Sequence, residues 1–158
     1  MSDVYYFAYG SNMNPKRVMA RGIEYSEILS GRLFDYELVF NKYSTKREGS
    51  AANIVRRANE VTEGVLYLLA DAVQITKMDP FEGFPDHYRR KKLRILADSK
   101  SLNAWVYIAN QRFVKENLLP PRWYLNHLLE GREFLSERYY KKLVDVRCLE
   151  NSEVEFSS

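Results

Sequence analysis

The sequence predicts a mixed α+β domain with a mainly antiparallel sheet, and three patterns support this prediction. Runs of aromatic and β-branched residues recur from Val4 to Ala109, several of them alternate between apolar and polar residues, and helical spacing becomes prominent only after Pro121. A length of 158 residues, 46 % of them apolar, suits one domain with a substantial core. We therefore expect a single domain over residues 1–149 and a polar C-terminal tail at 150–158.

The N-terminal segment predicts a buried strand, a loop and a short helix, in that order. Residues 4–9 are aromatic and β-prone, and this run ends at Gly10-Ser11-Asn12. Asn14 followed by Pro15 is typical of a helix N-cap with proline at the first helical position, and Gly22 can end that helix.

The next strands are predicted to form a meander. Residues 34–40 alternate with the period of two that is expected when one face of a strand is buried. A polar loop is predicted at 41–50. Two strand-like runs follow at 52–56 and 62–69, and the turn-like residues 58–60 separate them.

A short helix is predicted after the meander. Asp71 can cap a helix of about two turns, with Gln74 at the capping-box position. The helix should end before Pro80, because a residue that precedes proline avoids helical geometry. Residues 80–85 are then expected to form a loop.

Residues 88–96 and 102–109 predict a hairpin joined through residues 98–101. Its first strand carries a basic run, Arg89 to Lys92 followed by Arg94. The charged face of an edge strand explains this run without a partner, and binding of nucleic acid or a membrane surface is the less favoured alternative.

Apolar residues at helical spacing predict two helices in the C-terminal third. The first lies between Pro121 and Gly131, which are natural start and stop signals. The second begins at Ser136 and runs to about Val146.

Composition and motif content argue against several classes of function. The single cysteine, Cys148, can form neither an internal disulfide nor a Cys-based zinc site, and we expect it to be a small buried hydrophobe. The net charge of +3 is too small to argue for nucleic acid. We see no secretory signal and no membrane-spanning run, so a cytoplasmic protein is expected. The sequence has no P-loop, G-x-G-x-x-G or G-x-S-x-G motif, and His87 and His127 lack metal-ligand spacing.

The loop that follows the first strand is one candidate site. A glycine turn between a buried strand and a helix can point several backbone N–H groups at one place. Gly10 permits close approach of a ligand, and Ser11 and Asn12 add short donors. The loop can therefore bind a carboxylate or an oxyanion, and an ordinary strand-to-helix turn is the alternative.

Glu82 is the second candidate, because its surroundings are unusually apolar for a carboxylate. It lies between Phe81, Gly83 and Phe84 in a segment bracketed by prolines. Partial desolvation would raise its pKa toward neutrality, which suits a group that both accepts and returns a proton. A solvated loop glutamate is the alternative.

Several segments together resemble a known family. Residues 5–13, YYFAYGSNM, resemble the signature opening of the γ-glutamylcyclotransferase family, also called AIG2-like. Residues 63–67 resemble the strand that precedes a short helix in this family, and residues 79–83 resemble the segment that holds its acid–base glutamate. Tyr88 matches a tyrosine at the start of the following strand. Residues 120–124 resemble the start of a late helix, where the family places a tyrosine near the substrate.

The resemblance implies a small barrel-like fold with a pocket at one end, and an enzyme that cyclises a γ-glutamyl group to 5-oxoproline. It assigns the acid–base role to Glu82 and implies no metal and no organic cofactor. It further implies a small-molecule γ-glutamyl substrate that is contacted by Tyr6, Phe7, Ala8, Tyr9, Gly10, Ser11, Asn12, Tyr88 and Tyr124.

The leaving group stays open at this point. The chain is similar to compact family members with short loops around the pocket, so the substrate could be a γ-glutamyl amino acid, peptide or amine. An alternative from another class is a non-catalytic binding module of the same fold that recognises an acidic partner or a small ligand. No nucleic-acid or membrane partner is expected, and both monomer and homodimer are possible.

Overall fold

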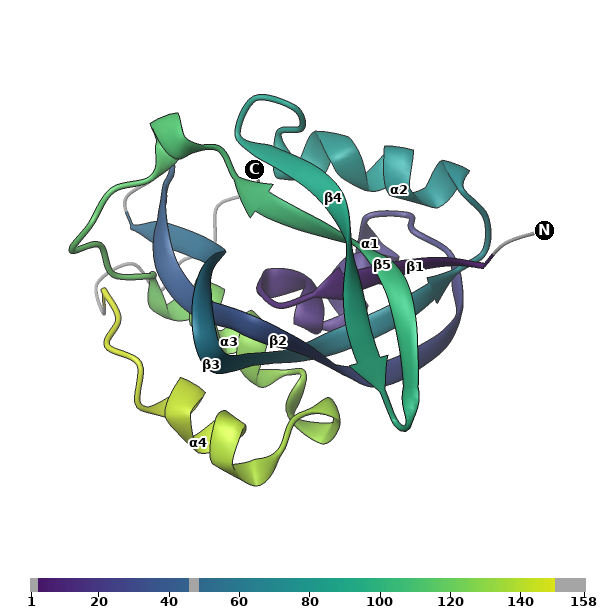
Figure 1. Cartoon of the computed structure of the whole chain (residues 1–158). Helices are drawn as coiled ribbons and strands as arrows, with labels where there is room; N and C mark the ends of the chain where they lie inside the picture. The colour runs from purple at the N-terminus through teal and green to yellow at the C-terminus, as the bar shows by residue number, and fades with distance from the viewer. Residues whose placement is uncertain (1–2, 46–48, 150–158) are drawn as a thin grey trace.

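The strands form a closed five-stranded barrel in the computed structural model, which describes residues 3–45 and 49–149 (Figure 1). Their order around the barrel is β1-β3-β2-β4-β5. Neighbouring strands are antiparallel except β1 and β5, which pair in parallel at Tyr6 and Trp105. The bounds are Val4–Ala8 for β1, Tyr25–Tyr43 for β2, Ser50–Leu69 for β3, Tyr88–Ala97 for β4 and Lys100–Ala109 for β5. The predicted mixed α+β, mainly antiparallel, barrel-like fold is confirmed.

Strands β2 and β3 are longer than the sequence patterns indicate, with 19 and 20 residues. The turn-like residues 58–60 do not separate two strands, because they lie within β3 opposite Asp35, where the pairing with β2 is irregular. The Asn59 N–H donates to the Asp35 carboxylate at 3.0 Å, and the two residues have φ values of 70° and 66°. The prediction of a turn was therefore wrong: these residues form a bulge in one continuous strand.

The polar segment 41–50, predicted to be a loop, belongs partly to the barrel, because β2 and β3 take up its two ends. Asn41 and Lys42 are buried. Nδ2 of Asn53 donates to Oδ1 of Asn41 at 3.0 Å, so a partner from the neighbouring strand replaces water. The loop prediction failed at this point because local polarity does not reveal a buried polar partner that is distant in sequence.

Strand β1 is a buried strand of the barrel wall, and the loop that follows it is held against β3. Tyr6 and Phe7 are buried, and β1 lies between β3 and β5. The Tyr67 hydroxyl of β3 donates to the backbone carbonyl of Asn12 at 2.7 Å. The loop after β1, which begins with Gly10 and continues as a 3-10 turn, η1 (Ser11–Met13), is thereby tied to the barrel wall.

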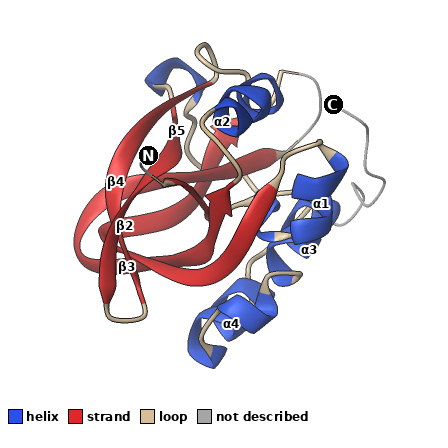
Figure 2. Ribbon diagram, turned by 90° about the vertical axis from the view of Figure 1, so that its right-hand side faces the viewer, coloured by secondary structure: helices blue, strands red, loops and turns tan. Residues whose placement is uncertain are grey.

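The described helices are short and cover the barrel. Helices α1, α3 and α4 lie along one side of it, and α2 lies apart from them (Figure 2). The predicted cap at Asn14 is confirmed, because its side chain accepts the N–H of Lys16 at 3.1 Å. Ser136, the predicted start of the last helix, is also a cap, and its side chain accepts the N–H of Tyr139 at 3.2 Å. The bounds are Pro15–Ala20 for α1, Val73–Met78 for α2, Arg122–Leu129 for α3 and Glu137–Val144 for α4.

Helix α2 leads directly into the segment that carries Glu82. The predicted cap at Asp71 was wrong by one position, because the N-cap residue of α2 is Ala72, whose side chain forms no capping hydrogen bond. The Asp71 carboxylate still accepts the N–H of Val73 at 3.0 Å and the side-chain amide of Gln74 at 3.2 Å. The α-helix ends before Pro80, as predicted. The chain then continues as a 3-10 turn, η2 (Asp79–Glu82), which corrects the prediction of a plain loop from residue 80.

The predicted hairpin is confirmed as β4 and β5, which pair along their whole length. Its basic run is not entirely a solvated face. The Arg90 guanidinium lies 4.5 Å from the ring centroid of Trp105 and donates to both carboxylate oxygens of Asp79, at 2.8 and 3.0 Å. Arg89 and Lys91 are exposed, but the prediction of an edge strand was wrong, because β4 lies between β2 and β5 in the closed barrel.

Three further sequence predictions concern membrane-spanning segments, Cys148 and the C-terminal tail. None of the helices in the described ranges is both long and apolar enough to cross a membrane. Cys148 is half-buried, with Sγ 3.6 Å from the carbonyl oxygen of Val146. The tail predicted at 150–158 lies outside the described residues.

Candidate active site

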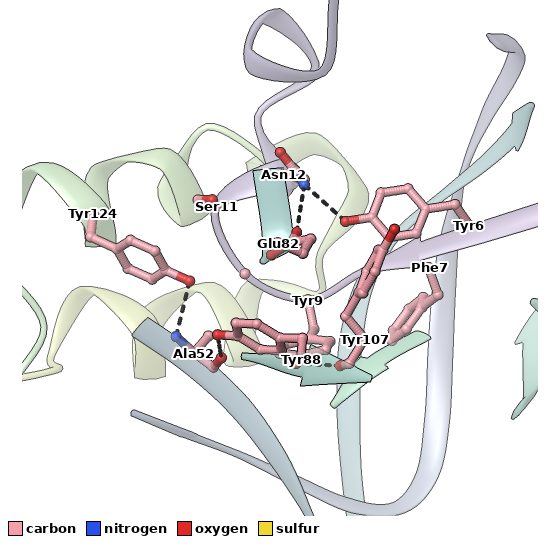
Figure 3. Close-up of a pocket in the computed structure, with 11 residues that line it drawn as sticks. Tyr6, Phe7, Tyr9, Ser11, Asn12, Ala52, Glu82, Tyr88, Tyr107 and Tyr124 are labelled. Carbon is pink, nitrogen blue, oxygen red and sulfur yellow. Dashed lines mark hydrogen bonds between the residues drawn. The ribbon is translucent and has the colours of Figure 1, made fainter. Parts of the chain in front are cut away.

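A cavity of about 310 Å³, counting its open mouth, lies where β1 runs into the loop after it (Figure 3). Strands, loop and helices that are far apart in the sequence all contribute to it. Most of the side chains are aromatic or small, and Glu82 is the one acidic group among the lining residues that the structure describes. The lining consists of Tyr6, Phe7, Tyr9, Gly10, Ser11, Asn12, Ala52, Glu82, Tyr88, Tyr107 and Tyr124.

Glu82 is held at the cavity because its 3-10 turn is anchored to the barrel. Asp79, at the start of η2, forms the two hydrogen bonds with Arg90 of β4 and accepts the hydroxyl of Tyr107 from β5 at 2.7 Å. The turn ends at Gly83, whose φ of 64° is readily adopted by glycine. Glu82 is therefore presented by a turn whose first residue is anchored to both β4 and β5.

Asn12 connects Glu82 to the loop after β1. Its Nδ2 donates to Oε1 of Glu82 at 3.2 Å and to the hydroxyl of Tyr6 at 2.9 Å (Figure 3). Its Oδ1 accepts from Nη1 of Arg21 at 3.1 Å. Because arginine can only donate, this contact orients the amide so that its donor end faces the carboxylate. Asn12 is 2 % exposed, so each of these hydrogen bonds replaces one to water.

Burial and the neighbouring cations shift the pKa of Glu82 in opposite directions. Burial raises the pKa of Glu82 above the ordinary value of a glutamate, and the nearby Asp79 adds to this effect. Arg21, Arg17 and Lys42 lower the same pKa, with Arg21 the strongest of the three, but burial prevails. A carboxyl with a raised pKa is suited to take up and return a proton near neutral pH.

Gly10 is required because the loop passes very close to its neighbours. A Cβ atom at this position would lie 2.9 Å from the Tyr124 hydroxyl and 3.1 Å from Cβ of Ala52. The same tyrosine accepts the N–H of Ala52 at 2.9 Å, and the Tyr88 hydroxyl donates to the carbonyl of Ala52 at 2.7 Å. The two tyrosines are thus fixed by the backbone of β3 at one side of the cavity.

The cavity opens into an outer cleft of about 1030 Å³, counting its open solvent. Ser11, Glu82, Tyr88 and Tyr124 line both spaces, so the two are continuous. Basic and polar groups distinguish the outer cleft from the cavity; those within the described residues are Arg17, Arg21, Lys42, Ser44, Thr45 and His87.

All but one of the residues predicted to contact a substrate line the cavity. The exception is Ala8, which is buried in β1 opposite Val65 and belongs to the core, because the strand turns its side chain into the packing of the barrel. Tyr107 and Ala52 also line the cavity and were not predicted. The alternation of apolar and polar residues in the predicted strand 102–109 could have indicated that Tyr107 faces inward. Ala52 contributes mainly through its backbone, and no sequence pattern indicates such a role.

The two histidines take part in packing and hydrogen bonding. His87 stacks on Phe113 with ring centroids 4.0 Å apart, and Nδ1 of His127 lies 3.0 Å from Nδ2 of Asn14. Within residues 3–45 and 49–149, no cluster of three or more His, Cys, Asp or Glu side chains could hold a metal ion.

Comparison with known proteins agrees with the resemblance seen in the sequence. A solved structure described as a gamma-glutamyl cyclotransferase is similar to 94 % of this chain over 90 % of its own length, with a TM-score of 0.81 and 22 % identity. A yeast gamma-glutamyl cyclotransferase specific to glutathione covers 92 % of this chain and 95 % of its own, with a TM-score of 0.67 and 13 % identity. At these identities the two structures establish the fold.

Sequence matches define the family. A protein of Methanocaldococcus jannaschii with the name "Putative gamma-glutamylcyclotransferase" is 47 % identical over 38 residues, which span 23 % of this chain and 32 % of that relative. The model of the family "Gamma-glutamyl cyclotransferase, AIG2-like" matches residues 6–126, most of the chain. The protein therefore belongs to the AIG2-like gamma-glutamyl cyclotransferase family.

Proposed function

We propose that this protein is an enzyme that converts a γ-glutamyl compound to 5-oxoproline and a released amine, with Glu82 as general acid and base. One observation carries the proposal: the Glu82 carboxylate lines the cavity, 3.2 Å from Asn12 of the loop after β1. Family membership supports the class of reaction. A pocket used only for binding would have no need of a partly desolvated carboxylate with a raised pKa.

In the proposed reaction the α-amino nitrogen attacks the γ-carbonyl carbon of the same molecule. A five-membered lactam forms, and the bond from that carbon to the leaving nitrogen breaks. The attacking nitrogen loses two protons between α-ammonium and lactam, and the leaving nitrogen gains two as it departs as an ammonium. Glu82 carries these protons one at a time and ends unchanged. Holding the substrate in its folded conformation can supply several of the roughly 7–11 kcal/mol available from orientation.

The loop after β1 and the tyrosines would bind the remaining polar atoms. The first N–H groups of the turn η1, those of Ser11 and Asn12, have no acceptor within the turn. In our proposal they stabilise the tetrahedral oxyanion or hold the substrate carboxylate, and a donor of this kind is worth about 2.7–4 kcal/mol. Tyr88 donates its one proton to Ala52, so it is placed to accept from the α-ammonium rather than to donate.

A product assay tests the proposed function directly. Purified protein is incubated with a panel of γ-glutamyl dipeptides and γ-glutamyl amines, and 5-oxoproline and the free amine are measured. We expect equal amounts of the two products from at least one compound. Release of neither from the whole panel would leave the protein as a binding module of the same fold.

The pH dependence of the reaction tests the electrostatic setting of Glu82. Only the ionised carboxylate can accept a proton, so kcat/KM is expected to rise with pH through the raised pKa of Glu82. Arg21→Gln removes the cation that lowers this pKa most, while Arg17 and Lys42 remain and Asp79 still raises it. The pKa should therefore rise further, and the midpoint of the acidic limb should move to higher pH.

The measurement is kcat/KM for one substrate across the acidic range. Arg94→Gln is the matched control, because Arg94 is an exposed arginine on β4 that donates to Ser101. The control should keep the wild-type midpoint. A midpoint in Arg21→Gln that stays in place or moves to lower pH would contradict this electrostatic account.

A further inference from the structure

Arg90 differs from its two neighbours in the basic run of β4. Arg89 and Lys91 are exposed, whereas the side chain of Arg90 is only 15 % exposed. Successive residues of a strand point to opposite faces, so Arg90 shares a face of the sheet with Tyr107, its partner on β5. Both side chains reach Asp79, the first residue of the turn η2. This part of the basic run is therefore directed at the candidate site and not at solvent.

Arg90 and Asp79 form a bidentate ion pair that is mostly removed from water. Nε of Arg90 donates to Oδ1 of Asp79 at 2.8 Å, and Nη2 donates to Oδ2 at 3.0 Å. The side chain of Asp79 is 14 % exposed. Two parallel hydrogen bonds fix the direction of the pair as well as its distance, and low exposure limits competition from water. The pair therefore holds the chain just before Glu82.

The same guanidinium contacts the chain that follows Glu82. It lies 4.8 Å from the ring centroid of Phe84 and 4.5 Å from that of Trp105 on β5. The N–H of Phe84 also donates to the backbone carbonyl of Asp79 at 3.1 Å, which closes the segment 79–84 into a compact turn. Arg90 thus contacts this segment on both sides of Glu82, and β5 supports the guanidinium through the ring of Trp105.

We propose that Arg90 is a positioning residue of the reaction, and that it holds the segment 79–84 so that the Glu82 carboxylate stays at the cavity. This inference rests on the proposed cyclotransferase function. Arg90 is not part of the described lining of the cavity or of the outer cleft, so it acts through Glu82 and not on the substrate. Proton transfer depends strongly on the position of the group that carries the proton, and a displacement of about 1 Å can lower the rate by about 10²-fold.

Arg90→Lys tests the proposal with a γ-glutamyl compound that the wild type converts. Lysine keeps the positive charge but has neither the bidentate geometry nor the planar group of arginine. We expect kcat for 5-oxoproline release to fall about tenfold and KM to change little. Arg94→Lys is the matched control, because Arg94 is exposed on the same strand, and it should keep the wild-type kcat. A folded Arg90→Lys protein with wild-type kcat would overturn the inference and leave the cyclotransferase function standing. Release of no product by the wild type would overturn both.

A binding measurement separates positioning of Glu82 from a general effect on the pocket. Calorimetry gives Kd of the same compound for Glu82→Gln and for the double variant Glu82→Gln/Arg90→Lys, in which turnover is slow because the acid–base group is absent. We expect the two Kd values to agree within about twofold, since Arg90 acts on Glu82 and not on the substrate. A Kd that weakens by as much as kcat falls in Arg90→Lys would show that Arg90 shapes the whole pocket, and would overturn the inference.

Asp79→Asn tests the same ion pair from its other partner and decides alone if Arg90→Lys fails to fold. An amide has one acceptor oxygen in place of two, so kcat should fall severalfold. It is measured well above the acidic limb, where Glu82 is ionised whether or not Asp79 is charged. Asp98→Asn, exposed in the turn after β4, is the matched control and should keep the wild-type kcat. Wild-type kcat in a folded Asp79→Asn protein would contradict the proposed role of the pair.

Discussion

Glu82→Gln is expected to lower kcat for 5-oxoproline release by about 10²–10⁴-fold, the range typical of a lost general acid–base group. The glutamine amide has almost the size of the carboxyl group but cannot take a proton from the substrate α-ammonium. Its oxygen can still accept from Nδ2 of Asn12, which lies 3.2 Å from Oε1 in the wild type. The fold and substrate binding should therefore change little, and the loss should appear in kcat rather than KM.

The experiment measures kcat and KM by product release and stability by thermal unfolding. Glu130→Gln makes the same change at an exposed position at the end of α3 and should leave both unaffected. A Glu82→Gln protein that folds and keeps full activity would show that Glu82 is not the acid–base group. The family assignment would stand in that case, because it rests on the match over residues 6–126.

Asn12→Leu should have the second largest effect, and it should lower both activity and stability. The side chains are similar in size, but leucine offers no donor to Glu82 and no acceptor to Arg21. A hydrogen bond to a charged group contributes about 1.5–3 kcal/mol, so we expect kcat/KM to fall roughly 10–150-fold. The free energy of unfolding should fall by a similar amount, because Arg21 loses an acceptor.

Asn126→Leu is the matched control, since Asn126 is exposed on α3. Its kcat/KM should equal that of the wild type. The two losses in Asn12→Leu can be separated by working well below the unfolding temperature, where a fully folded variant with reduced kcat/KM isolates the effect on the site. A folded Asn12→Leu protein with wild-type kcat/KM would exclude Asn12 as the residue that positions Glu82.

Local rules predicted the chain well where neighbours in sequence decide the structure. The first strand ends at Ala8, shortly before Gly10, the cap at Asn14 forms, and the helix after Asp71 ends before Pro80. The same rules failed at 58–60, where turn residues form a bulge within a long strand. Such residues favour a local change of direction, but the pairing with β2 decides whether the chain reverses.

The candidate site was predictable in part. Glu82 stood out because its neighbours are apolar, and the loop after β1 stood out because a glycine turn follows an aromatic strand. Tyr107 was missed although it lines the cavity and supports Asp79 with its hydroxyl. Lys42 was placed in a polar loop, whereas the barrel buries it beside His87.

The sequence by itself determined the class of fold, the order of most elements and the two segments of the candidate site, because caps, turns and strand alternation depend on residues close together in the chain. Only the tertiary structure decided that Asn12 contacts Glu82, that Arg21 orients this amide, and that a cleft with basic residues in its lining continues outward from the cavity. These features arise between residues far apart in sequence, whose distance is set by barrel closure and strand register. No local pattern of residue types encodes such a distance.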